Sequence, residues 1–482
     1  MISFIQRLED LAAESPNEVS ITCGSDSITR AELMRQGYNL AVYLHEHGTR
    51  EGDMVTVAVP NSLDFFIAYV AAWRLGATPQ PISSRLPQRE LEAIIELANP
   101  SALVGVAESD FPGRTSVPMG FRAPDADASR LPYVISQAWK APTSGGSTGR
   151  PKLIVSGDPA AFDETAPPPL MMDPGGCLVM PGPLYHNGPA VWSCQALLNG
   201  LQVALLPRFD ALGTLEEIQK HKGTVLYMVP TMMKRILRLP DEERLSFDLS
   251  SLRVVWHLAE PCPEWLKLAW IEWLGAERIF ELYAGTEAQI ATVITGPEWM
   301  AHSGSVGRVV PGTVSITDED GNEVSVGEMG EVWMRSPRAT PTYKYLGATA
   351  RTRDGGWESL GDMGRLDEDG YLYLGDRAAD MILSGGANIY PAEIESAIQE
   401  HPAVKSCAVI GLPDEDKGNT VHAIIEAEIT EVSQEELQQF LGERLVIYKV
   451  PRTFEFVDFA LRDDAGKVRR SALRAERVKV EE

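Results

Sequence analysis

The chain has 482 residues, of which 44% are hydrophobic and 23% charged, so it can build a large core and is not a disordered protein. Its formal net charge of -25 excludes nonspecific attraction to nucleic acid or to an anionic membrane. Its five cysteines are widely spaced and form no CxxC pair, so they suggest neither a zinc site nor a disulfide framework: Cys23, Cys177, Cys194, Cys262 and Cys407.

Targeting and membrane signals are missing from the sequence. The N-terminus lacks the pattern of a signal peptide, and the most apolar stretch, 65–73, is too short to span a bilayer. We therefore expect a cytoplasmic protein without integral membrane association.

Strand-like and helix-like segments alternate along most of the chain. The expected strands are 54–59, 102–106, 153–155, 177–180, 202–206, 224–229 and 252–256, and the expected helices include 63–75 and 264–274. This alternation predicts an α/β fold with layered parallel sheets.

The pattern changes twice in the last third of the chain. From Val306 to Tyr373 short β runs are separated by Asp- and Gly-rich turns, which predicts a β-rich subdomain. Beyond residue 376, helices at 391–400 and 434–445 and strands at 406–410 and 421–428 predict a small α+β domain. We therefore predict an N-terminal core of residues 1–375 and a C-terminal domain of residues 376–482.

One loop is suited to hold a polyphosphate. Residues 143–152 read Thr-Ser-Gly-Gly-Ser-Thr-Gly-Arg-Pro-Lys, in which glycines allow close backbone approach, hydroxyls donate hydrogen bonds and Lys152 adds a positive charge. The Gly-Lys-Ser/Thr ending of a Walker A loop is missing, which argues against an ATP hydrolase of that type. Such a cluster can also be a linker, but the expected strand 153–155 would fix this loop to a sheet.

Four further segments carry polar groups that suit nucleotide chemistry. They are Glu-Leu-Tyr-Ala-Gly-Thr-Glu at 281–287, Ser-Leu-Gly-Asp at 359–362, the Gly- and Ala-rich run at 375–391, and Gly-Lys-Val-Arg-Arg at 466–470. Taken singly, each could be a solvated loop or a surface ion pair.

Taken together, in this order and at these spacings, the motifs resemble those of the adenylate-forming (ANL) enzymes, which include acyl-CoA synthetases, nonribosomal-peptide adenylation domains and luciferases. The resemblance extends from Ile28 to Leu473. It implies that a carboxylate attacks the α-phosphate of ATP, giving an acyl-adenylate and pyrophosphate, and that a nucleophile then displaces AMP. It also implies Mg²⁺ as a cofactor and a mobile C-terminal domain. Because an anion must attack a polyanion, catalysis depends on positioning and electrostatic stabilisation.

The resemblance also implies a role for individual residues. Glu287 would hold Mg²⁺, Thr286 would contact the α-phosphate, and Lys467 would neutralise the attack. His186 would separate the ATP and acid sites, although it could be an ordinary loop histidine. The other implied nucleotide-binding residues are Thr143, Ser144, Gly145, Gly146, Ser147, Thr148, Lys152, Glu260, Tyr283, Asp362 and Arg377.

The acid pocket is expected among residues 185–195, 256–260 and 284–290. The residues implied to line it are Tyr185, Trp192, Trp256, Ala259, Ala284, Gly285 and Gln289. The two tryptophans favour an aromatic or polycyclic acid, although both could be core residues. The run that begins at Leu258 is similar to that of bile-acid and aryl CoA ligases.

Two positions depart from the family pattern. Ala284 stands where glycine is common and would narrow the acyl site, and Ala379 stands at the implied hinge, where Asp or Lys is common. The acceptor is therefore open between CoA, which is commonest, and an amine, which would make the protein an amide synthetase. A nucleotide-binding pseudoenzyme is a third reading, which the presence of Lys467 and Glu287 disfavours. The resemblance also allows a homodimer.

Overall fold

A nine-stranded sheet forms the central layer of the protein. The structure, a computed structural model, describes residues 1–145, 151–377, 380–384, 387–414, 418–427, 432–463 and 466–478. The strand order is β17-β16-β15-β14-β13-β11-β12-β2-β3. The bounds are β2 (Val19–Cys23), β3 (Asp26–Thr29), β11 (Cys177–Met180), β12 (Gln202–Leu205), β13 (Val225–Met228), β14 (Val254–Leu258), β15 (Ile279–Ala284), β16 (Ala291–Thr295) and β17 (Arg308–Val309).

Across the sheet, the neighbouring strands β2, β12, β11, β13, β14 and β15 pair in parallel, as the alternating pattern predicts. All positions of β11, β13 and β14 are buried, which is typical of parallel strands covered on both faces. The helices of the N-terminal part are α1 (Phe4–Glu14), α2 (Arg30–Glu46), α3 (Leu63–Arg74), α4 (Gln88–Ala98), α5 (Asn187–Leu198), α6 (Ala211–His221), α7 (Pro230–Leu237), α8 (Asp241–Arg244), α9 (Glu264–Leu274) and α10 (Gly296–Ala301).

The strand expected at 252–256 is displaced along the sequence. The expected strand 252–256 is β14 at Val254–Leu258, because exposed Arg253 precedes the paired run and the partner strand β15 continues the ladder to Leu258. The shift carries His257 and Leu258 into the sheet and leaves Ala259 as the first residue beyond its edge.

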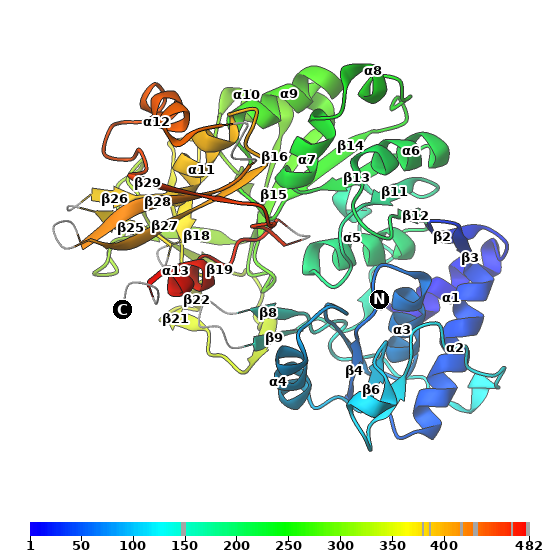
Figure 1. The fold of residues 1–482 in the computed structure, drawn as a ribbon. Helices are drawn as coiled ribbons and strands as arrows, with labels where there is room; N and C mark the ends of the chain where they lie inside the picture. Colours follow the sequence, from blue (N-terminus) through cyan, green and yellow to red (C-terminus); the bar gives the residue numbers. More distant parts are fainter. Residues whose placement is uncertain are drawn as a thin grey trace.

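A second, four-stranded parallel sheet has the order β5-β4-β6-β7 and occupies the N-terminal end of the molecule (Figure 1). Its strands are β4 (Met54–Val57), β5 (Thr78–Pro81), β6 (Ala102–Val104) and β7 (Thr115–Val117). The neighbouring helix α3 is buried along nearly its whole length, and its Phe65, Tyr69 and Trp73 belong to the main hydrophobic core. This burial explains why the most apolar stretch of the sequence is a core helix.

The described ends of the expected polyphosphate loop lie on paired strands. β8 (Thr143–Gly145) pairs with β9 (Pro151–Ser156), and β9 pairs with β20 (Tyr343–Leu346) from the β-rich part. The β-rich part itself is a six-stranded sheet of β18 (Thr313–Thr317), β19 (Gly330–Arg335), β21 (Arg351–Arg353), β22 (Trp357–Ser359), β23 (Asp362–Leu366) and β24 (Leu372–Arg377). A short pair, β1 (Ile2–Ser3) with β10 (Ala161–Phe162), completes the N-terminal part.

The C-terminal residues build a separate small core, coloured orange to red in Figure 1. Its elements are β25 (Ile382–Ser384), β26 (Ala387–Ile389), α11 (Pro391–Gln399), β27 (Ser406–Asp414), β28 (Gly418–Glu426), α12 (Gln434–Gly442), β29 (Thr453–Val457) and α13 (Arg470–Val478). The domain boundary after residue 375 stays a prediction, and β24 continues to Arg377 in the sheet of the N-terminal part.

The two parts meet at α7. Lys234 Nζ donates to the carbonyl oxygen of Val404 at 3.4 Å, and Arg238 Nη2 donates to that of Pro402 at 3.3 Å. Burial in this contact lowers the pKa of Lys234 to about 7.

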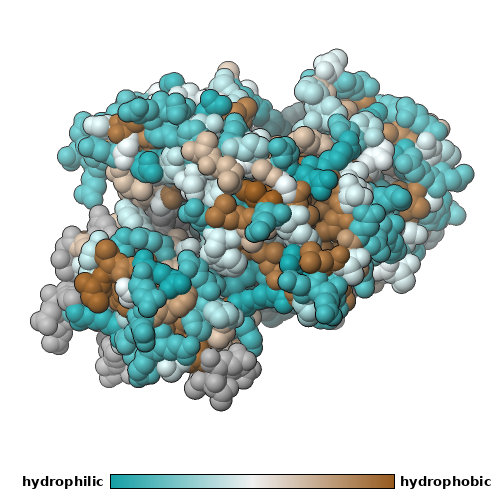
Figure 2. Space-filling view, turned by 90° about the horizontal axis from the view of Figure 1, so that it is seen from above, coloured by the Kyte–Doolittle hydropathy of each residue, from teal (hydrophilic) through white to brown (hydrophobic). Residues whose placement is uncertain are grey.

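Within the described residues, no helix combines the length and the apolar character needed to cross a bilayer. The face in Figure 2 is mostly hydrophilic, with apolar side chains gathered in small patches.

Candidate functional site

The candidate site lies beyond the carboxyl ends of neighbouring parallel strands. β11 leads to residues 183–187, β14 leads to Ala259 and Glu260, and β15 leads to residues 285–289. In open α/β sheets this edge is where ligands bind, because loops from adjacent strands meet there. The sequence motifs are therefore gathered by the topology of the sheet.

Two residues implied to bind the nucleoside are in direct contact. The Tyr283 hydroxyl, at the end of β15, donates a 2.6 Å hydrogen bond to Oδ2 of Asp362, the first residue of β23. Asp362 is buried, and its backbone pairs with that of Arg377 on β24. Three predicted residues from distant parts of the sequence thus lie side by side.

A second cluster joins the phosphate loop to the predicted metal ligand. Lys152 Nζ lies 3.4 Å from Oε1 of Glu287, and the Tyr345 hydroxyl donates to the same oxygen at 2.5 Å. Lys152 also donates to the Tyr345 hydroxyl at 3.0 Å. The sequence analysis predicted Lys152 and Glu287 but missed Tyr345, because its strand carries no motif and lies 58 residues from Glu287.

The phosphate loop is described at its two ends. Thr143 Oγ1 accepts a 2.8 Å hydrogen bond from Gln80 Nε2, and the backbones of Ser144 and Gly145 pair with those of Lys152 and Pro151. The predicted residues Gly146, Ser147 and Thr148, and the predicted hinge residue Ala379, lie outside the described residues.

Glu260 contacts the C-terminal segment that carries Lys467. Its Oε2 accepts a 2.8 Å hydrogen bond from Thr231, while Oε1 lies so close to Gly466 that a Cβ atom there would be 1.2 Å away. Burial raises the pKa of Glu260 to about 7. The role of Glu260 in nucleotide binding stays a prediction, but its position brings Lys467 to the edge of the site.

The Lys467 segment is fixed to the C-terminal core. The backbone N–H of Lys467 donates to Asp463 Oδ1 at 2.9 Å, and the side chain is exposed. On either flank, Arg462 and Arg470 form ion pairs with buried Glu395 of α11 at 2.9 and 2.8 Å. The turn is thus held from both sides by one carboxylate.

The predicted acid pocket contains an aromatic cluster. Trp192 of α5 packs edge-to-face on Trp256 of β14 at 6.2 Å between ring centroids and on Tyr227 at 5.5 Å. Trp256 also contacts Phe280 and donates through Nε1 to the carbonyl oxygen of Leu170 at 3.0 Å. Both tryptophans are buried and belong to the main core.

Other pocket predictions fall on the loops around this cluster. His186 precedes α5 as its N-cap residue, and its ring lies 4.3 Å from that of Tyr185. Ala284, the last residue of β15, is exposed, and Gln289 donates to Glu358 at 3.1 Å. A Cβ at Gly285 would lie 2.4 Å from the Cδ1 atom of Leu360, so a side chain there would require Leu360 to move.

Two alanines beside the site have strained backbones. Ala259 and Ala288 adopt φ values of +75° and +54°, a left-handed conformation that costs an L-residue roughly 1–2 kcal/mol. Such strain concentrates at functional loops, because the surrounding structure enforces it. Its presence on both loops supports this edge as the site.

Lys140 is a further residue that the sequence analysis missed. It is buried, donates to Asn187 Oδ1 at the start of α5, and has no carboxylate partner among the described residues. Burial lowers its pKa to about 8. Its position in the otherwise apolar run Ala-Trp-Lys-Ala-Pro at 138–142 could have drawn attention to it.

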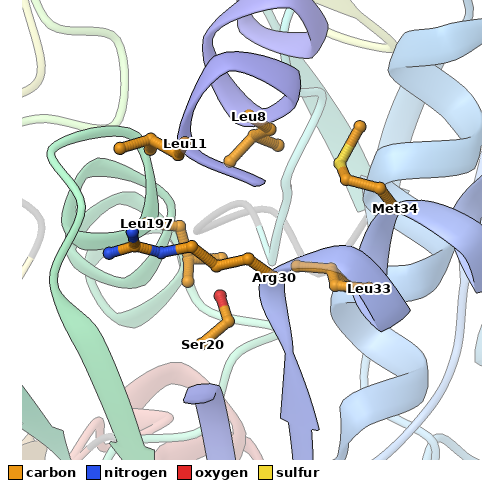
Figure 3. Close-up of a pocket in the computed structure, with 7 residues that line it drawn as sticks. All are labelled: Leu8, Leu11, Ser20, Arg30, Leu33, Met34 and Leu197. Carbon is orange, nitrogen blue, oxygen red and sulfur yellow. The ribbon is translucent and has the colours of Figure 1, made fainter. Parts of the chain in front are cut away.

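No group of three or more His, Cys, Asp or Glu side chains in the described part of the chain could hold a metal ion. The pocket in Figure 3 lies apart from the site, between α1, β2, α2 and α5, where Arg30 donates to the carbonyl oxygen of Gly200 at 2.9 Å. Neither feature offers an alternative centre.

Family models and known proteins match nearly the whole chain. The profile described as AMP-binding enzyme matches residues 8–344, and that described as AMP-binding enzyme C-terminal domain matches residues 393–467. A feruloyl-CoA synthase from Amycolatopsis sp is 31% identical over 493 residues, covering 96% of each chain.

Two solved structures share the fold. The o-succinylbenzoate coenzyme A synthetase MenE from Bacillus subtilis, in complex with ATP and magnesium ion, is 25% identical with a TM-score of 0.80, covering 97% of this chain and 98% of that one. The amide bond synthetase McbA from Marinactinospora thermotolerans is 27% identical with a TM-score of 0.81, covering 98% of this chain and 99% of that one.

Proposed function

The chain belongs to the AMP-binding enzyme family, and we propose from this premise that it activates an aromatic or polycyclic carboxylic acid and transfers it to CoA. Membership makes it an ATP-dependent, AMP-forming ligase of the acid–thiol type. In the first step a carboxylate oxygen attacks the α-phosphorus of ATP and pyrophosphate leaves. In the second, the thiol sulfur of CoA attacks the acyl carbon, AMP leaves with the former carboxylate oxygen, and the thiol proton is released.

The observation that carries this proposal is the contact of Gly466 with Glu260. In this contact the segment with Lys467 lies against the loop after β14, next to β15, the strand that carries Tyr283. An ammonium group there would offset the repulsion between the incoming carboxylate and the α-phosphate, which is the main electrostatic barrier to the first step. Tyr283 and Asp362 would hold the nucleoside, and Lys152 would hold the outer phosphates.

The donor set also fits a magnesium ion bound with the nucleotide. Mg²⁺ prefers oxygen ligands and commonly uses one or two carboxylates together with substrate phosphates. Glu287 offers one carboxylate, and the described residues contain no larger acidic cluster. Glu287 would hold the ion, which when bound would offset part of the phosphate charge.

The aromatic preference rests on the cluster around Trp192. Its indole N–H is buried without an acceptor among the described residues, so an oxygen atom on the acid would satisfy it. The similar synthase from Amycolatopsis sp is named for a feruloyl group, which also has an aromatic ring with oxygen substituents.

ATP–pyrophosphate exchange across an acid panel tests the first step. The panel contains substituted cinnamic and benzoic acids, polycyclic acids and long-chain fatty acids, with the Lys467→Ala variant as control. We expect exchange with aromatic or polycyclic acids only and none in the variant. Exchange restricted to fatty acids would overturn the aromatic assignment, and nucleotide binding without exchange for any acid would support a nucleotide sensor.

An amine is the alternative acceptor, because the fold matches that of the amide bond synthetase McbA along nearly the whole chain. Supplying an active acid, ATP, CoA and several amines together, with products identified by mass spectrometry, distinguishes the two. We expect the acyl thioester as the main product, whereas an amide formed in preference to the thioester would favour the alternative.

A further inference from the structure

Tyr345 contacts the proposed metal-binding carboxylate although it belongs to no nucleotide motif. Its hydroxyl donates to Glu287 Oε1 at 2.5 Å, and Lys152 Nζ approaches the same oxygen at 3.4 Å. Lys152 also lies 4.1 Å from the centre of the Tyr345 ring. One carboxylate oxygen is therefore occupied by two donors.

The backbone fixes this arrangement. β20 pairs with β9 so that Tyr345 lies opposite Ile154, two residues beyond Lys152. From the same segment, Thr342 Oγ1 donates to the backbone oxygen of Glu287 at 2.7 Å. The segment thus holds Glu287 by its main chain and its side chain, and that side chain is only 6% exposed.

The second carboxylate oxygen is in a different environment. No described residue donates to Glu287 Oε2, which lies beside Gly285, where an added Cβ would be 3.0 Å away. We propose that Tyr345 is a positioning residue that fixes Oε1 of Glu287 and thereby presents Oε2 to the Mg²⁺ of bound MgATP. This inference rests on the proposed function, because it assumes that Glu287 is the metal ligand.

Lys152 gives the arrangement a second property. The ammonium group of Lys152 neutralises Glu287 and repels a divalent cation. Free Mg²⁺ should therefore bind weakly to this carboxylate before the nucleotide arrives. Bound phosphates would draw Lys152 toward themselves, which leaves the carboxylate held by the neutral Tyr345 hydroxyl. Metal binding should therefore depend on the nucleotide.

Electron paramagnetic resonance of Mn²⁺ tests the positioning role of Tyr345 and the nucleotide dependence of metal binding without measuring catalysis. The enzyme is titrated with Mn²⁺ with and without α,β-methylene-ATP, an analogue that cannot transfer its AMP group because its α–β bridge is not cleaved. The wild type should bind Mn²⁺ tightly only with the analogue. Tyr345→Phe should weaken that binding about tenfold or more, as loss of a residue that orients a metal ligand commonly does. Lys152→Met should instead allow Mn²⁺ binding without nucleotide.

Tyr373→Phe is the matched control, because this tyrosine hydroxyl also donates to a carboxylate, that of Asp367 at 3.0 Å, and not to Glu287. It should leave Mn²⁺ affinity unchanged. If Tyr345→Phe does not fold, Glu287→Asp tests the same contact, since its shorter side chain keeps the carboxylate but withdraws it from the tyrosine hydroxyl.

The outcomes separate the two levels of the hypothesis. Wild-type Mn²⁺ affinity in folded Tyr345→Phe, or in Glu287→Asp, would overturn the positioning role while acid-dependent pyrophosphate exchange still supported the ligase. Wild-type Mn²⁺ affinity in Glu287→Gln would show that Glu287 is not the metal ligand. The proposed metal-binding role of Glu287 and the positioning role of Tyr345 would then both be wrong.

Discussion

Replacing Gly466 with alanine should selectively block the first half-reaction. Gly466 has φ of +77°, where alanine costs about 1–2 kcal/mol, and its new Cβ would lie 1.2 Å from Glu260 Oε1. An ordinary contact is 3.4–4 Å, so the carboxylate would have to move by about 2 Å. That movement would strain or break the hydrogen bond from Thr231, which is worth roughly another 1 kcal/mol.

These costs sum to about 2–3 kcal/mol against the docked arrangement, or roughly 30- to 150-fold in its population. Single-turnover formation of the acyl-adenylate, measured by rapid quench, should slow by about this factor. Transfer from preformed acyl-adenylate to CoA should change by less than about threefold, because that step does not need the Gly466 contact.

A second substitution separates the steric cost from the backbone cost. Glu260→Gly removes the obstructing carboxylate. The double variant with Gly466→Ala should therefore form the adenylate faster than the product of the two single effects predicts. A deficit of about tenfold should remain, because alanine at position 466 still has a strained φ. An adenylation rate in Gly466→Ala equal to that of the wild type would refute the docking of this segment as the active arrangement.

Three other changes test separate parts of the structure. Lys467→Ala should slow adenylate formation about 100-fold or more with unchanged ATP affinity by calorimetry, and a normal single-turnover rate would count against its role. Lys267→Met would leave buried Glu281, now paired with Lys267 at 2.6 Å, without its partner and should cost about 3–5 kcal/mol in urea unfolding. Adding Glu281→Gln should recover part of this loss, and a loss below about 1 kcal/mol would show that the pair is dispensable. Burial lowers the pKa of Lys140 from 10.5 to about 8, so the folded state holds fewer protons than the unfolded chain between those pH values and stability should rise with pH there, by at most about 3 kcal/mol. Lys140→Met should remove this rise when urea midpoints at pH 7.5 and 10 are compared, and an unchanged slope would contradict the assignment.

The parts of the site that lie in continuous motifs could be predicted from the sequence. Lys152 follows the glycine-rich loop directly, and Glu287 follows the strand that ends at Ala284, so local pattern and family resemblance both mark them. The α/β fold was predictable for the same reason, because buried parallel strands leave apolar runs such as 177–180.

Contacts made by the tertiary fold could not be predicted in this way. Tyr345 reaches Glu287 only because β20 pairs with β9, and Glu260 meets Gly466 across about 200 residues of sequence. Lys140 was missed because the neighbouring sequence does not indicate whether a single lysine in an apolar run is buried or points to solvent. The two-residue error at β14 has a similar origin, since its end is set by the partner strand β15.

The attachment of Arg462 and Arg470 to Glu395 has a consequence for the direction of the reaction. Both flanks of the turn are tied to the C-terminal core, so Lys467 would leave the nucleotide if that domain turns to admit the acceptor, as the family resemblance implies. Pyrophosphate could then no longer regenerate ATP, since the cation needed for the reverse attack would be gone. The same movement that admits the thiol would therefore prevent reversal of the first step and commit the activated acid to product.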